Sequence, residues 1–529
     1  MISYKNLLAA LLAAAVFLSV AMYVLFHGQL DEDAYILLQY VKNLSEGAGI
    51  CFDVTQGRAE GATDFLWMLM LAGLSRLGVD PGTAAAVLNA SGMAAIAYLA
   101  FRMSGGIGLI SGGAVLAVLI SGGVAAALGG FSTLAYGALY AMLTVAVIER
   151  RCSLAVAAAI LTMLFRPDGA ILAIGALAVL AIDVRKSEPL NVRRLLLVPL
   201  VAGAAYYLWR YLYFGMPLPL PIMIKQRTDT VFEGLEMNFL AIRYYLPLVV
   251  PVILACRSGR RREVAAVVSG PVLLFAALSF AQQSQNTGFR FQFPIVLSIL
   301  FAFLVTRDAA AGSARKIGTV LLLVPGMISG ASLINDNLAI MTSADYINSF
   351  PQLLRLRRFE VDKIALTECG KFAYWYNPRQ MTDLAGLNSP DVAVQGPRRV
   401  LGMRQPQLVF VHHFGRYWMK DFPAGSDYLV VKSTDIALNG PYSGNISILS
   451  APDAALVYAQ QHGYLAVLVK YGASDELYSH VYFLGPDIDV RLFLQTLEES
   501  FQVTMSYYQS RRLLDERAGY FKPSQFERP

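Results

Sequence analysis

The 529-residue chain has few charged residues and few cysteines. Only 15% of its residues are charged and 56% are hydrophobic, whereas about 25% of the residues of an ordinary soluble domain are charged. This composition excludes a soluble globular protein and an intrinsically disordered one. The four cysteines, Cys51, Cys152, Cys256 and Cys369, lack the spacing of a zinc module or a disulfide scaffold. At most Cys51 and Cys369 are expected to pair.

The sequence also lacks a nucleotide-binding loop. Neither GxxxxGK[ST] nor a strand followed by GxGxxG is present, which argues against a nucleotide as substrate. His412 and His413 are adjacent on a predicted strand, where their side chains point to opposite faces, so they do not predict a metal site. The net charge is +6. Because the basic residues cluster in short loops between apolar runs, they indicate membrane topology rather than nucleic-acid binding.

Long apolar runs fill the first 335 residues. The first covers residues 7–26, enough at about 1.5 Å per residue to cross a hydrocarbon core of about 30 Å. We interpret it as an uncleaved helix rather than a signal peptide, because further spans follow. Those spans are expected at residues 83–101, 107–127, 131–148, 152–165, 169–182, 195–213, 243–256, 264–281, 292–306 and 317–335. The sequence therefore predicts about eleven transmembrane helices.

The distribution of basic residues predicts the orientation. The apolar stretch 65–77 is too short to span and carries Trp67 and Arg76, so we expect it to lie at the membrane interface. Most Lys and Arg of the loops then lie on the side of Lys5, and the positive-inside rule puts the N-terminus in the cytoplasm of a bacterial inner-membrane protein. The loop 27–82, the turns 166–169 and 282–290, the loop 214–242 and everything after residue 335 then lie on the periplasmic side.

The hydrophobic pattern changes near residue 335. Short alternating runs predict strands at 363–367, 408–412, 428–432, 445–449, 464–470 and 480–484, and helical patterns lie at 343–358, 452–462 and 488–502. We therefore expect two domains. Residues 1–335 form an α-helical polytopic membrane domain, and residues 336–529 form a C-terminal extracytoplasmic α/β domain.

The first outer loop opens with three carboxylates, Asp31, Glu32 and Asp33. They are consistent with a solvated helix cap, but the same loop carries amides, further carboxylates and aromatic rings that suit sugars at a membrane surface. Carboxylates are the usual bases for deprotonating a hydroxyl group, a contribution of about 10²- to 10⁴-fold. The three are therefore candidate catalytic residues. The candidate acceptor-binding residues of this loop are Tyr35, Tyr40, Lys42, Arg58, Glu60, Asp64 and Trp67.

Basic residues elsewhere on the outer side are candidates for binding a lipid-linked phosphate. Arg166 and Asp168 lie between two apolar runs, where a charge costs about 2.5 to 3.5 kcal/mol. They either pair with each other or face an aqueous site, in which case Asp168 is a further acceptor contact. Arg and Lys at the interface suit a phosphate, and snorkelling to headgroups is the alternative. The candidate phosphate-binding residues are Lys225, Arg290, Arg166 and Asn286.

The order of several motifs resembles a known family. Asp33-Ala34-Tyr35-Ile36, followed by Glu60-Gly61 and by Thr63 with Phe65-Leu66-Trp67, is similar to the first outer loop of GT-C glycosyltransferases of the mycobacterial arabinofuranosyltransferase B type, which reads "AYI" and then "EGYTNFLW". The resemblance continues through Arg166-Pro167-Asp168-Gly169, Tyr213-Phe214-Gly215, Arg290 and Thr367-Glu368-Cys369-Gly370. The chain departs from the pattern at Gln39, where the family has Arg, and at Ser132, where it has an acid.

The resemblance implies a membrane glycosyltransferase with a GT-C fold. Such an enzyme transfers a sugar, arabinofuranose in that family, from a polyprenyl-phosphate carrier to a cell-envelope glycan or protein on the periplasmic face. Carried over, Asp33 is the base, with Glu32 and Asp31 as rivals, and Glu368 is an acceptor contact. In-line displacement implies inversion at the anomeric carbon. A divalent cation near the acidic loop is left open, and no other cofactor is expected.

Two other functions fit part of the sequence. A flippase or transporter of lipid-linked sugars explains the intramembrane Arg166 and Asp168 but not the outer domain or the acidic loop. A non-catalytic assembly partner would tolerate replacement of the three acids without loss of product. For each reading the expected partners are a polyprenyl-phosphate sugar, membrane lipid and a glycan or protein, and not nucleic acid. In the outer domain, Tyr374, Trp375, Tyr376 and Trp418 are candidate sugar-stacking residues.

Overall fold

The computed structural model of the chain comprises two compact units. It describes residues 3–187, 194–225, 231–249, 260–281, 283, 286–306, 324, 327–328, 330–339, 341–342, 345–414, 427–436, 447–471 and 478–503. The helical unit consists of Met1–Ala34, Leu44–Gly49 and Ala62–Thr342, and the α/β unit consists of Tyr35–Asn43, Ile50–Gly61 and Ser343–Pro529. Two short segments of the first outer loop thus cluster with the α/β unit, although the sequence assigned the whole loop to the membrane domain.

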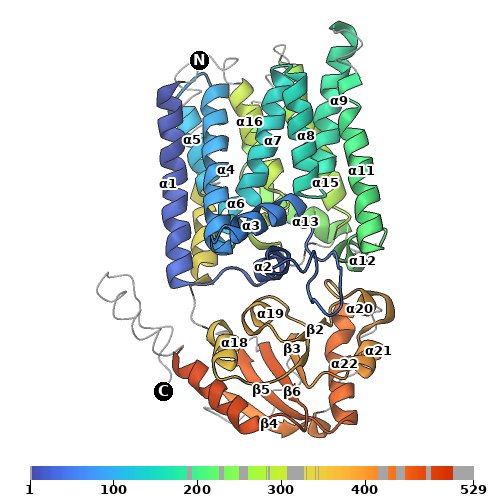
Figure 1. Cartoon of the computed structure of the whole chain (residues 1–529). Coiled ribbons are helices and arrows are strands. Elements are labelled where there is room, and N and C mark those ends of the chain that lie inside the picture. Colours follow the sequence, from blue (N-terminus) through green and yellow to red (C-terminus); the bar gives the residue numbers. More distant parts are fainter. Residues whose placement is uncertain are drawn as a thin grey trace, which may run out of the picture. The chain divides into compact units, whose positions relative to one another are not determined.

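The helical unit is a bundle of long helices that lie side by side (Figure 1). Its long helices are α1 (Tyr4–His27), α4 (Pro81–Met103), α7 (Thr133–Ile148), α8 (Cys152–Phe165), α9 (Gly169–Ser187), α11 (Val198–Phe214), α15 (Arg261–Leu278) and α16 (Phe293–Thr306). Its shorter elements are α3 (Phe65–Arg76), α5 (Leu109–Leu119), α6 (Gly122–Leu128), α12 (Leu220–Ile224), α13 (Val231–Ile242), η1 (Leu246–Leu248) and η2 (Thr287–Phe289), and α2 (Glu32–Ser45) follows α1. Most of these helices coincide with the predicted apolar runs.

Three helices of the described chain are long and apolar enough to cross a membrane: Tyr4–His27, Pro81–Met103 and Thr287–Val305. Helices α5 and α6 together form a fourth candidate, bent by 46° at their junction. The single span expected at 107–127 is therefore broken, because Gly122 and Gly123 bring the chain against the backbone of Gly288 and the ring of Phe293, where a side chain would not fit. Further apolar helices are shorter, and the count of eleven spans stays a prediction.

Helix α3 is the short apolar segment that the sequence placed at the membrane interface. In Figure 1 it crosses the ends of the long helices instead of running parallel to them. Trp67, Met68 and Leu71 are buried along one side of α3. At its end, Arg76 donates from Nε to the carbonyl oxygen of Ser45 over 3.1 Å. This orientation is the one expected of a helix that lies along an interface.

The α/β unit contains one six-stranded sheet with the order β2-β1-β3-β6-β5-β4. Strand β1 runs parallel to β2 and β3, and the other neighbouring strands are antiparallel. The strands are β1 (Lys363–Leu366), β2 (Gln380–Asp383), β3 (Leu408–Phe414), β4 (Tyr428–Lys432), β5 (Leu465–Tyr471) and β6 (Tyr478–Leu484). The helices are α18 (Tyr346–Leu356), α19 (Lys371–Tyr376), α20 (Pro390–Gln395), α21 (Pro397–Arg404) and α22 (Ser447–Gln461), with η5 at Ser433–Asp435.

Two sequence predictions for this unit are wrong in detail. The strand expected at 445–449 is not formed, because residues from Ser447 onward belong to α22, and two alternating isoleucines are too short a pattern to separate a strand from a helix. The sequence missed β2, whose four residues Gln-Met-Thr-Asp show no alternation. The predicted helix at 488–502 is present, since residues 490–503 are helical.

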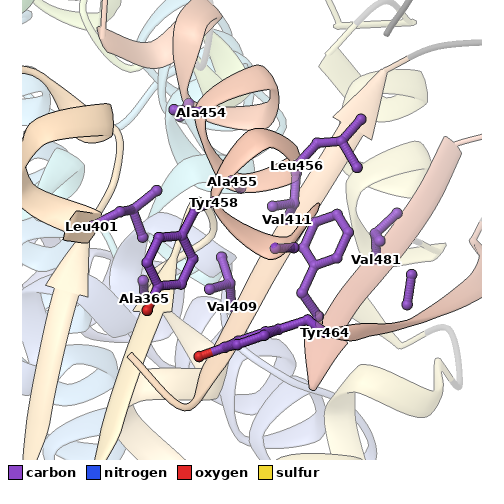
Figure 2. Close-up of a cluster of buried hydrophobic side chains, with 14 of the residues drawn as sticks. Ala365, Leu401, Val409, Val411, Ala454, Ala455, Leu456, Tyr458, Tyr464 and Val481 are labelled. Carbon is purple, nitrogen blue, oxygen red and sulfur yellow. The ribbon is translucent and has the colours of Figure 1, made fainter. Parts of the chain in front are cut away.

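Small side chains let α22 pack closely on the sheet. Ala451, Ala455 and Ala459 recur every four residues along α22 and are fully buried. They belong to the same hydrophobic core as Val409 and Val411 of β3 (Figure 2). A repeat of four residues keeps a single helix face toward the strands, and this contact forms the core of the unit.

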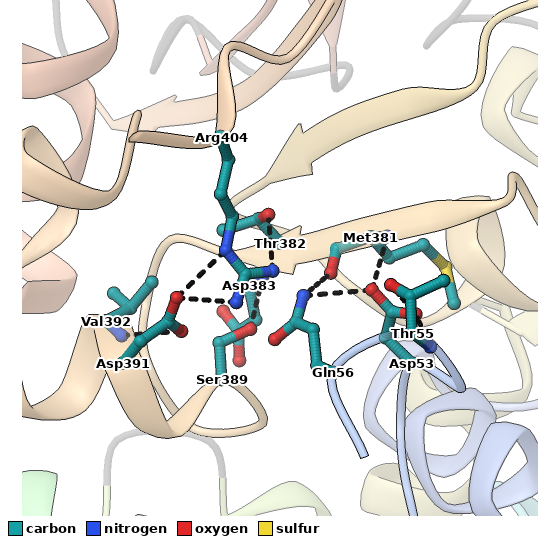
Figure 3. Close-up of polar contacts among 10 residues, drawn as sticks. All are labelled: Asp53, Thr55, Gln56, Met381, Thr382, Asp383, Ser389, Asp391, Val392 and Arg404. Carbon is teal, nitrogen blue, oxygen red and sulfur yellow. Dashed lines mark hydrogen bonds and ion pairs between the residues drawn. The ribbon is translucent and has the colours of Figure 1, made fainter. Parts of the chain in front are cut away.

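Segments of the first outer loop are bonded to the edge strand β2 within the α/β unit. The Oδ2 atom of Asp53 accepts the backbone N–H of Met381 over 2.8 Å, and Gln56 donates to the carbonyl oxygen of Met381 (Figure 3). Tyr40 donates from its hydroxyl group to Oδ1 of Asn388 over 3.1 Å. The carboxylate of Asp383, whose pKa is raised by burial, in turn accepts from the side chain of Asn388 over 2.9 Å. Asp53, Tyr40 and Asp383 therefore hold the loop to the strand.

The cysteines of the described chain do not form a disulfide bond. Cys51 and Cys369 both belong to the α/β unit, are buried and are not joined in a disulfide. The pairing expected from the sequence is therefore wrong. Burial raises the pKa of the Cys51 thiol, and the neighbouring Asp53 raises it further, so Cys51 stays protonated and unreactive near neutral pH.

Candidate active site

The first acid, Asp31, caps helix α2. Its Oδ1 atom accepts the backbone N–H of Asp33 over 3.0 Å, as an N-cap side chain does. Its Oδ2 atom accepts from the hydroxyl group of Thr287 over 3.1 Å. Its own backbone N–H donates to the carbonyl oxygen of Gly129 over 3.0 Å. Both carboxylate oxygens of Asp31 are thus used to hold the start of α2 against the turn that contains Thr287.

The third acid, Asp33, forms an ion pair with Arg290. Oδ2 of Asp33 lies 3.2 Å from Nη2 of Arg290, and the two side chains are only 22% and 11% exposed. The guanidinium of Arg290 stacks over the ring of Phe131 at 3.9 Å and contacts Phe291 at 5.1 Å. Its second nitrogen, Nη1, is buried and makes no hydrogen bond within the described structure. Arg290 therefore offers a buried N–H donor beside a candidate base.

A network of buried amides positions the turn that carries Arg290. Asn286 donates to Oε1 of Gln292 over 2.7 Å and accepts the backbone N–H of Phe291 over 3.2 Å. Gln292 donates to Oδ1 of Asn238 in α13 over 2.9 Å. The turn also contains Gly288 at φ +62°, where a Cβ atom would collide with the backbone of α6. Asn286, predicted to bind phosphate, thus uses its amide inside the fold to support Arg290.

The turn between α8 and α9 holds a second ion pair. Arg166 donates from Nε and Nη2 to the two carboxylate oxygens of Asp168, over 3.0 and 3.1 Å. The guanidinium of Arg166 lies 4.8 Å from the ring centre of Tyr136 and 5.3 Å from that of Phe291. The internal pair, one of the two alternatives left open by the sequence, is therefore present. Because Phe291 contacts both arginines, the two ion pairs lie next to each other.

Asp64 brings a further carboxyl group to the two arginines. It directly precedes α3, and its Oδ2 atom accepts from the hydroxyl group of Ser132 over 2.5 Å. Ser132 follows Phe131, the residue that stacks on Arg290. The pKa of the Asp64 carboxyl is raised by burial and lowered by the charges of Arg166 and Arg290. The first loop, the 166–169 turn and the 282–290 turn thus meet, as the topology predicted.

Burial and neighbouring charges shift the pKa of an acid in this cluster. Burial raises the pKa of the Asp31 carboxyl, the nearby Asp33 carboxylate raises it further, and Arg290 lowers it. Two carboxyl groups this close do not ionise independently. Of the two acids, Asp31 uses both oxygens in the fold and Asp33 contacts Arg290, so Asp33 is the better placed to act as a general base. Sequence reasoning missed Thr287, Phe131 and Tyr136, which carry no charge to mark them.

The other predicted phosphate ligand, Lys225, lies at the end of α12. Its backbone N–H closes that helix by donating to the carbonyl oxygen of Pro221 over 3.0 Å. Arg227, which follows, lies outside the described residues. Glu32, between Asp31 and Asp33, is the first residue of α2. Its role as a rival base stays a prediction.

Most predicted acceptor contacts belong to the α/β unit. Tyr35 is buried against Tyr374 and Trp375, with ring centres 5.3 and 5.9 Å apart. Tyr40 is fully buried, so a sugar-stacking role for it is not supported. The remaining members of this group are Lys42 and Glu368, which are half-buried, Glu60, which is buried, and Arg58, which is exposed.

Two further aromatic predictions are corrected by burial. Trp67 of the helical unit is fully buried, with its ring 5.9 Å from that of Phe165, so it has no face available to a sugar. Tyr376 is buried and donates from its hydroxyl group to the carbonyl oxygen of Phe359. Trp418 lies outside the described residues. Among the candidates for stacking, Tyr374 and Trp375 are the two that remain half-exposed.

The described residues contain no group of three or more His, Cys, Asp or Glu side chains arranged to hold a metal ion. In the acidic loop, Asp31 is engaged by Thr287 and Asp33 is engaged by Arg290. The divalent cation left open by the sequence therefore has no defined ligand set here. We assign no step to it.

The chain is similar in structure to proteins of known structure. No protein-family model matches the sequence, and no curated protein matches it. The structure resembles the crystal structure of ArnT from Cupriavidus metallidurans bound to undecaprenyl phosphate, with a TM-score of 0.54 at 13% identity. The match covers 88% of this chain and 97% of that chain. The chain therefore has the fold of ArnT, which in this chain comprises the helical unit and the α/β unit.

Proposed function

We propose that this protein is a membrane glycosyltransferase that transfers a sugar from a polyprenyl-phosphate carrier to a hydroxyl group of an acceptor, with inversion at the anomeric carbon. The observation that carries this proposal is the buried Asp33–Arg290 pair, in which Arg290 keeps one unpartnered N–H donor. A base and a buried cation side by side are the two groups that this reaction needs.

Asp33 is the proposed base. Both carboxylate oxygens of Asp31 accept hydrogen bonds, from the backbone N–H of Asp33 and from the hydroxyl group of Thr287. Asp33 contacts Arg290 through its Oδ2 atom alone within the described structure. The Oδ1 atom of Asp33 accepts the proton of the acceptor hydroxyl. The acceptor oxygen then attacks the anomeric carbon as the bond from that carbon to the phosphate oxygen breaks. The electron pair of that bond leaves with polyprenyl phosphate.

Arg290 is the proposed ligand of the leaving phosphate. Its Nη1 donor is buried, and a charge-assisted hydrogen bond to a phosphate oxygen would satisfy it. Negative charge develops on that oxygen as the sugar departs, so the interaction strengthens toward the transition state. Arg166 is held by both oxygens of Asp168, so it contributes a more distant positive charge. The role of Lys225 in phosphate binding is part of the proposal, whereas Asn286, whose amide is engaged inside the fold, would act by holding the turn of Arg290.

The lipid carrier is supported by the fold. ArnT, whose fold this chain has, was crystallised with undecaprenyl phosphate. The helices of this chain that are long enough to cross a membrane would hold such a carrier in the bilayer. The proposal extends to a periplasmic site in the bacterial inner membrane, to arabinofuranose as the sugar and to an envelope glycan or protein as the acceptor, which the α/β unit would bind. These finer assignments derive from the sequence pattern and its resemblance.

The test is transfer by the purified protein in detergent. Polyprenyl-phosphate arabinofuranose and polyprenyl-phosphate hexoses are supplied with cell-envelope acceptors, and product is followed by mass spectrometry. We expect transfer from at least one donor and release of polyprenyl phosphate in equal amount. Arg290→Gln should reduce transfer by about 100-fold or more, whereas Asp80→Asn, which alters an exposed helix cap, should not. Sugar transfer that is unaffected by Arg290→Gln would contradict the assignment.

A further inference from the structure

A second group of polar side chains lies next to the Asp33–Arg290 pair and has no role in the proposed reaction. Its centre is Asp64. Ser132 occupies the Oδ2 atom of Asp64, and no hydrogen bond to Oδ1 is formed within the described structure. Two neighbouring polar atoms, Nε1 of Trp67 and Oγ1 of Thr133, are buried and make no hydrogen bond in the described structure, while the nearby hydroxyl of Tyr136 interacts with Asp168. Such orphaned atoms are uncommon in native proteins and call for a ligand or water.

Local geometry places these atoms in one region. Trp67 lies three residues after Asp64, one turn into α3. Thr133 follows Ser132 and opens α7, and Tyr136 lies one turn further on the same helix. The rings of Trp67 and Tyr136 both pack on Phe165, with centres 5.9 and 6.1 Å away. The group therefore brings two unsatisfied polar atoms and one open carboxylate oxygen into the same region.

The charges show what class of ligand fits. Arg166 is paired with both carboxylate oxygens of Asp168, so its positive charge is already matched there and Asp64 is an additional acid. An additional acid disfavours a phosphate here, while Nη1 of Arg290 offers a phosphate its partner nearby. A neutral hydroxyl group donates to a carboxylate and accepts from N–H or O–H donors at the same time.

We propose that Asp64, held by Ser132 and flanked by Trp67, Thr133 and Tyr136, binds hydroxyl groups of the sugar carried by the lipid donor. This proposal rests on the proposed function. It assigns Asp64 to the donor rather than to the acceptor, because Ser132 adjoins Phe131, which stacks on Arg290. A sugar attached to a phosphate at Arg290 would therefore lie close to Asp64. Asp64 is a determinant of donor recognition, and Arg290 is a determinant of phosphate binding.

The test compares donors with and without their sugar. Binding of bare polyprenyl phosphate and of polyprenyl-phosphate sugars to the full-length protein in detergent is measured for wild type, Asp64→Asn and Ser132→Ala. We expect Asp64→Asn to weaken the glycosylated donor by about tenfold or more, the size of one charged hydrogen bond. The bare lipid should bind unchanged. Ser132→Ala should act in the same direction with a smaller effect, and it keeps the test open should Asp64→Asn not fold.

Each other outcome has a defined meaning. Equal weakening of both lipids by Asp64→Asn would overturn the proposal, since Asp64 would then support the fold or the phosphate. An effect confined to the acceptor KM would reassign Asp64 to the acceptor. If both variants still distinguish the glycosylated donor from bare polyprenyl phosphate as wild type does, the proposal is overturned, and water alone would fill the hydrogen bonds of these buried polar atoms. If wild type neither binds nor transfers any donor, the proposed function fails as well. Asp80→Asn is the matched control, because Asp80 caps α4 as Asp64 precedes α3.

Discussion

Exchanging the two acids of the first loop separately tests the assignment of the base. Asp33→Asn removes the carboxylate that we assign as base and leaves Arg290 buried without its partner. Asp31→Asn keeps a helix cap, because Asn accepts the backbone N–H of Asp33 about as well as Asp does. The two substitutions therefore make the same chemical change two residues apart, but Asp33→Asn removes the assigned base and Asp31→Asn replaces a helix cap.

The expected size of each effect follows from the geometry. Loss of a general base should lower kcat by about 10²- to 10⁴-fold for Asp33→Asn. At 3.2 Å the Coulomb attraction between Asp33 and Arg290 is about 1.3 kcal/mol in a water-like medium and about 5 kcal/mol at an effective dielectric constant of 20. Because both groups are mostly buried and desolvation offsets part of this attraction, we expect Asp33→Asn to lower the free energy of unfolding by about 1 to 3 kcal/mol. Asp31→Asn should change kcat by less than about tenfold.

The assay is steady-state sugar transfer in detergent, with thermal unfolding of each variant as the control for folding. Asp33→Asn should lose kcat while the KM for the lipid donor changes little, because we assign the phosphate contact to Arg290. If Asp31→Asn abolishes transfer and Asp33→Asn does not, the base is Asp31 and the reasoning from unoccupied oxygen atoms is refuted. Full activity of both variants would favour a transporter or an assembly partner over an enzyme.

Three further predictions concern stability. Gly288→Ala should destabilise the helical unit by about 2 kcal/mol or more, seen as earlier thermal unfolding, since φ is +62° and a methyl group would overlap a backbone carbonyl of α6; Gly112→Ala, in open space, should be tolerated. Burial holds the pKa of His480 well below its usual 6.5, so on acidification His480 is protonated in the unfolded chain before it is protonated in the folded one. Lowering the pH from 7.5 to 5.5 should therefore reduce the free energy of unfolding by up to about 1.4 kcal/mol, and His480→Gln should abolish this pH dependence. Thiol labelling should modify Cys51 and Cys369 only after denaturation, and without prior reduction.

Hydrophobic periodicity predicted the fold well where the pattern was long. The runs that became α1 and α4 cover twenty and nineteen residues, the length expected of a helix that crosses a membrane. It failed where the pattern was short. The strand β2 has four residues without alternation and is held at the sheet edge by contacts to β1 and to Asp53, which lies over three hundred residues earlier. A contact of that separation leaves no signal in a local window of sequence.

The candidate site was predictable only in its charged residues. Asp33, Arg290, Arg166 and Asp168 stand out because a charge beside apolar runs must be paired or solvated. Which residue pairs with which was not predictable, since Asp33 and Arg290 are separated by 257 residues. The neutral members of the site, Thr287, Ser132 and Tyr136, are of residue types that are common in membrane proteins, so their type alone does not mark them as site residues. They acquire a role only through their contacts with the charged residues.

The first outer loop shows why a composition-based site was too broad. The sequence treated its carboxylates and aromatic rings as one sugar-binding surface. In the structure, Asp31, Asp33 and Asp64 belong to the helical unit, whereas residues 35–43 and 50–61 belong to the α/β unit. Tyr40 and Asp53 use their polar atoms to bond to that unit, so they support a fold and not a reaction. A loop shared in this way separates the carboxylates proposed for catalysis from those that bond to the α/β unit, and substitution of Asp53 should therefore affect unfolding of the α/β unit before it affects transfer.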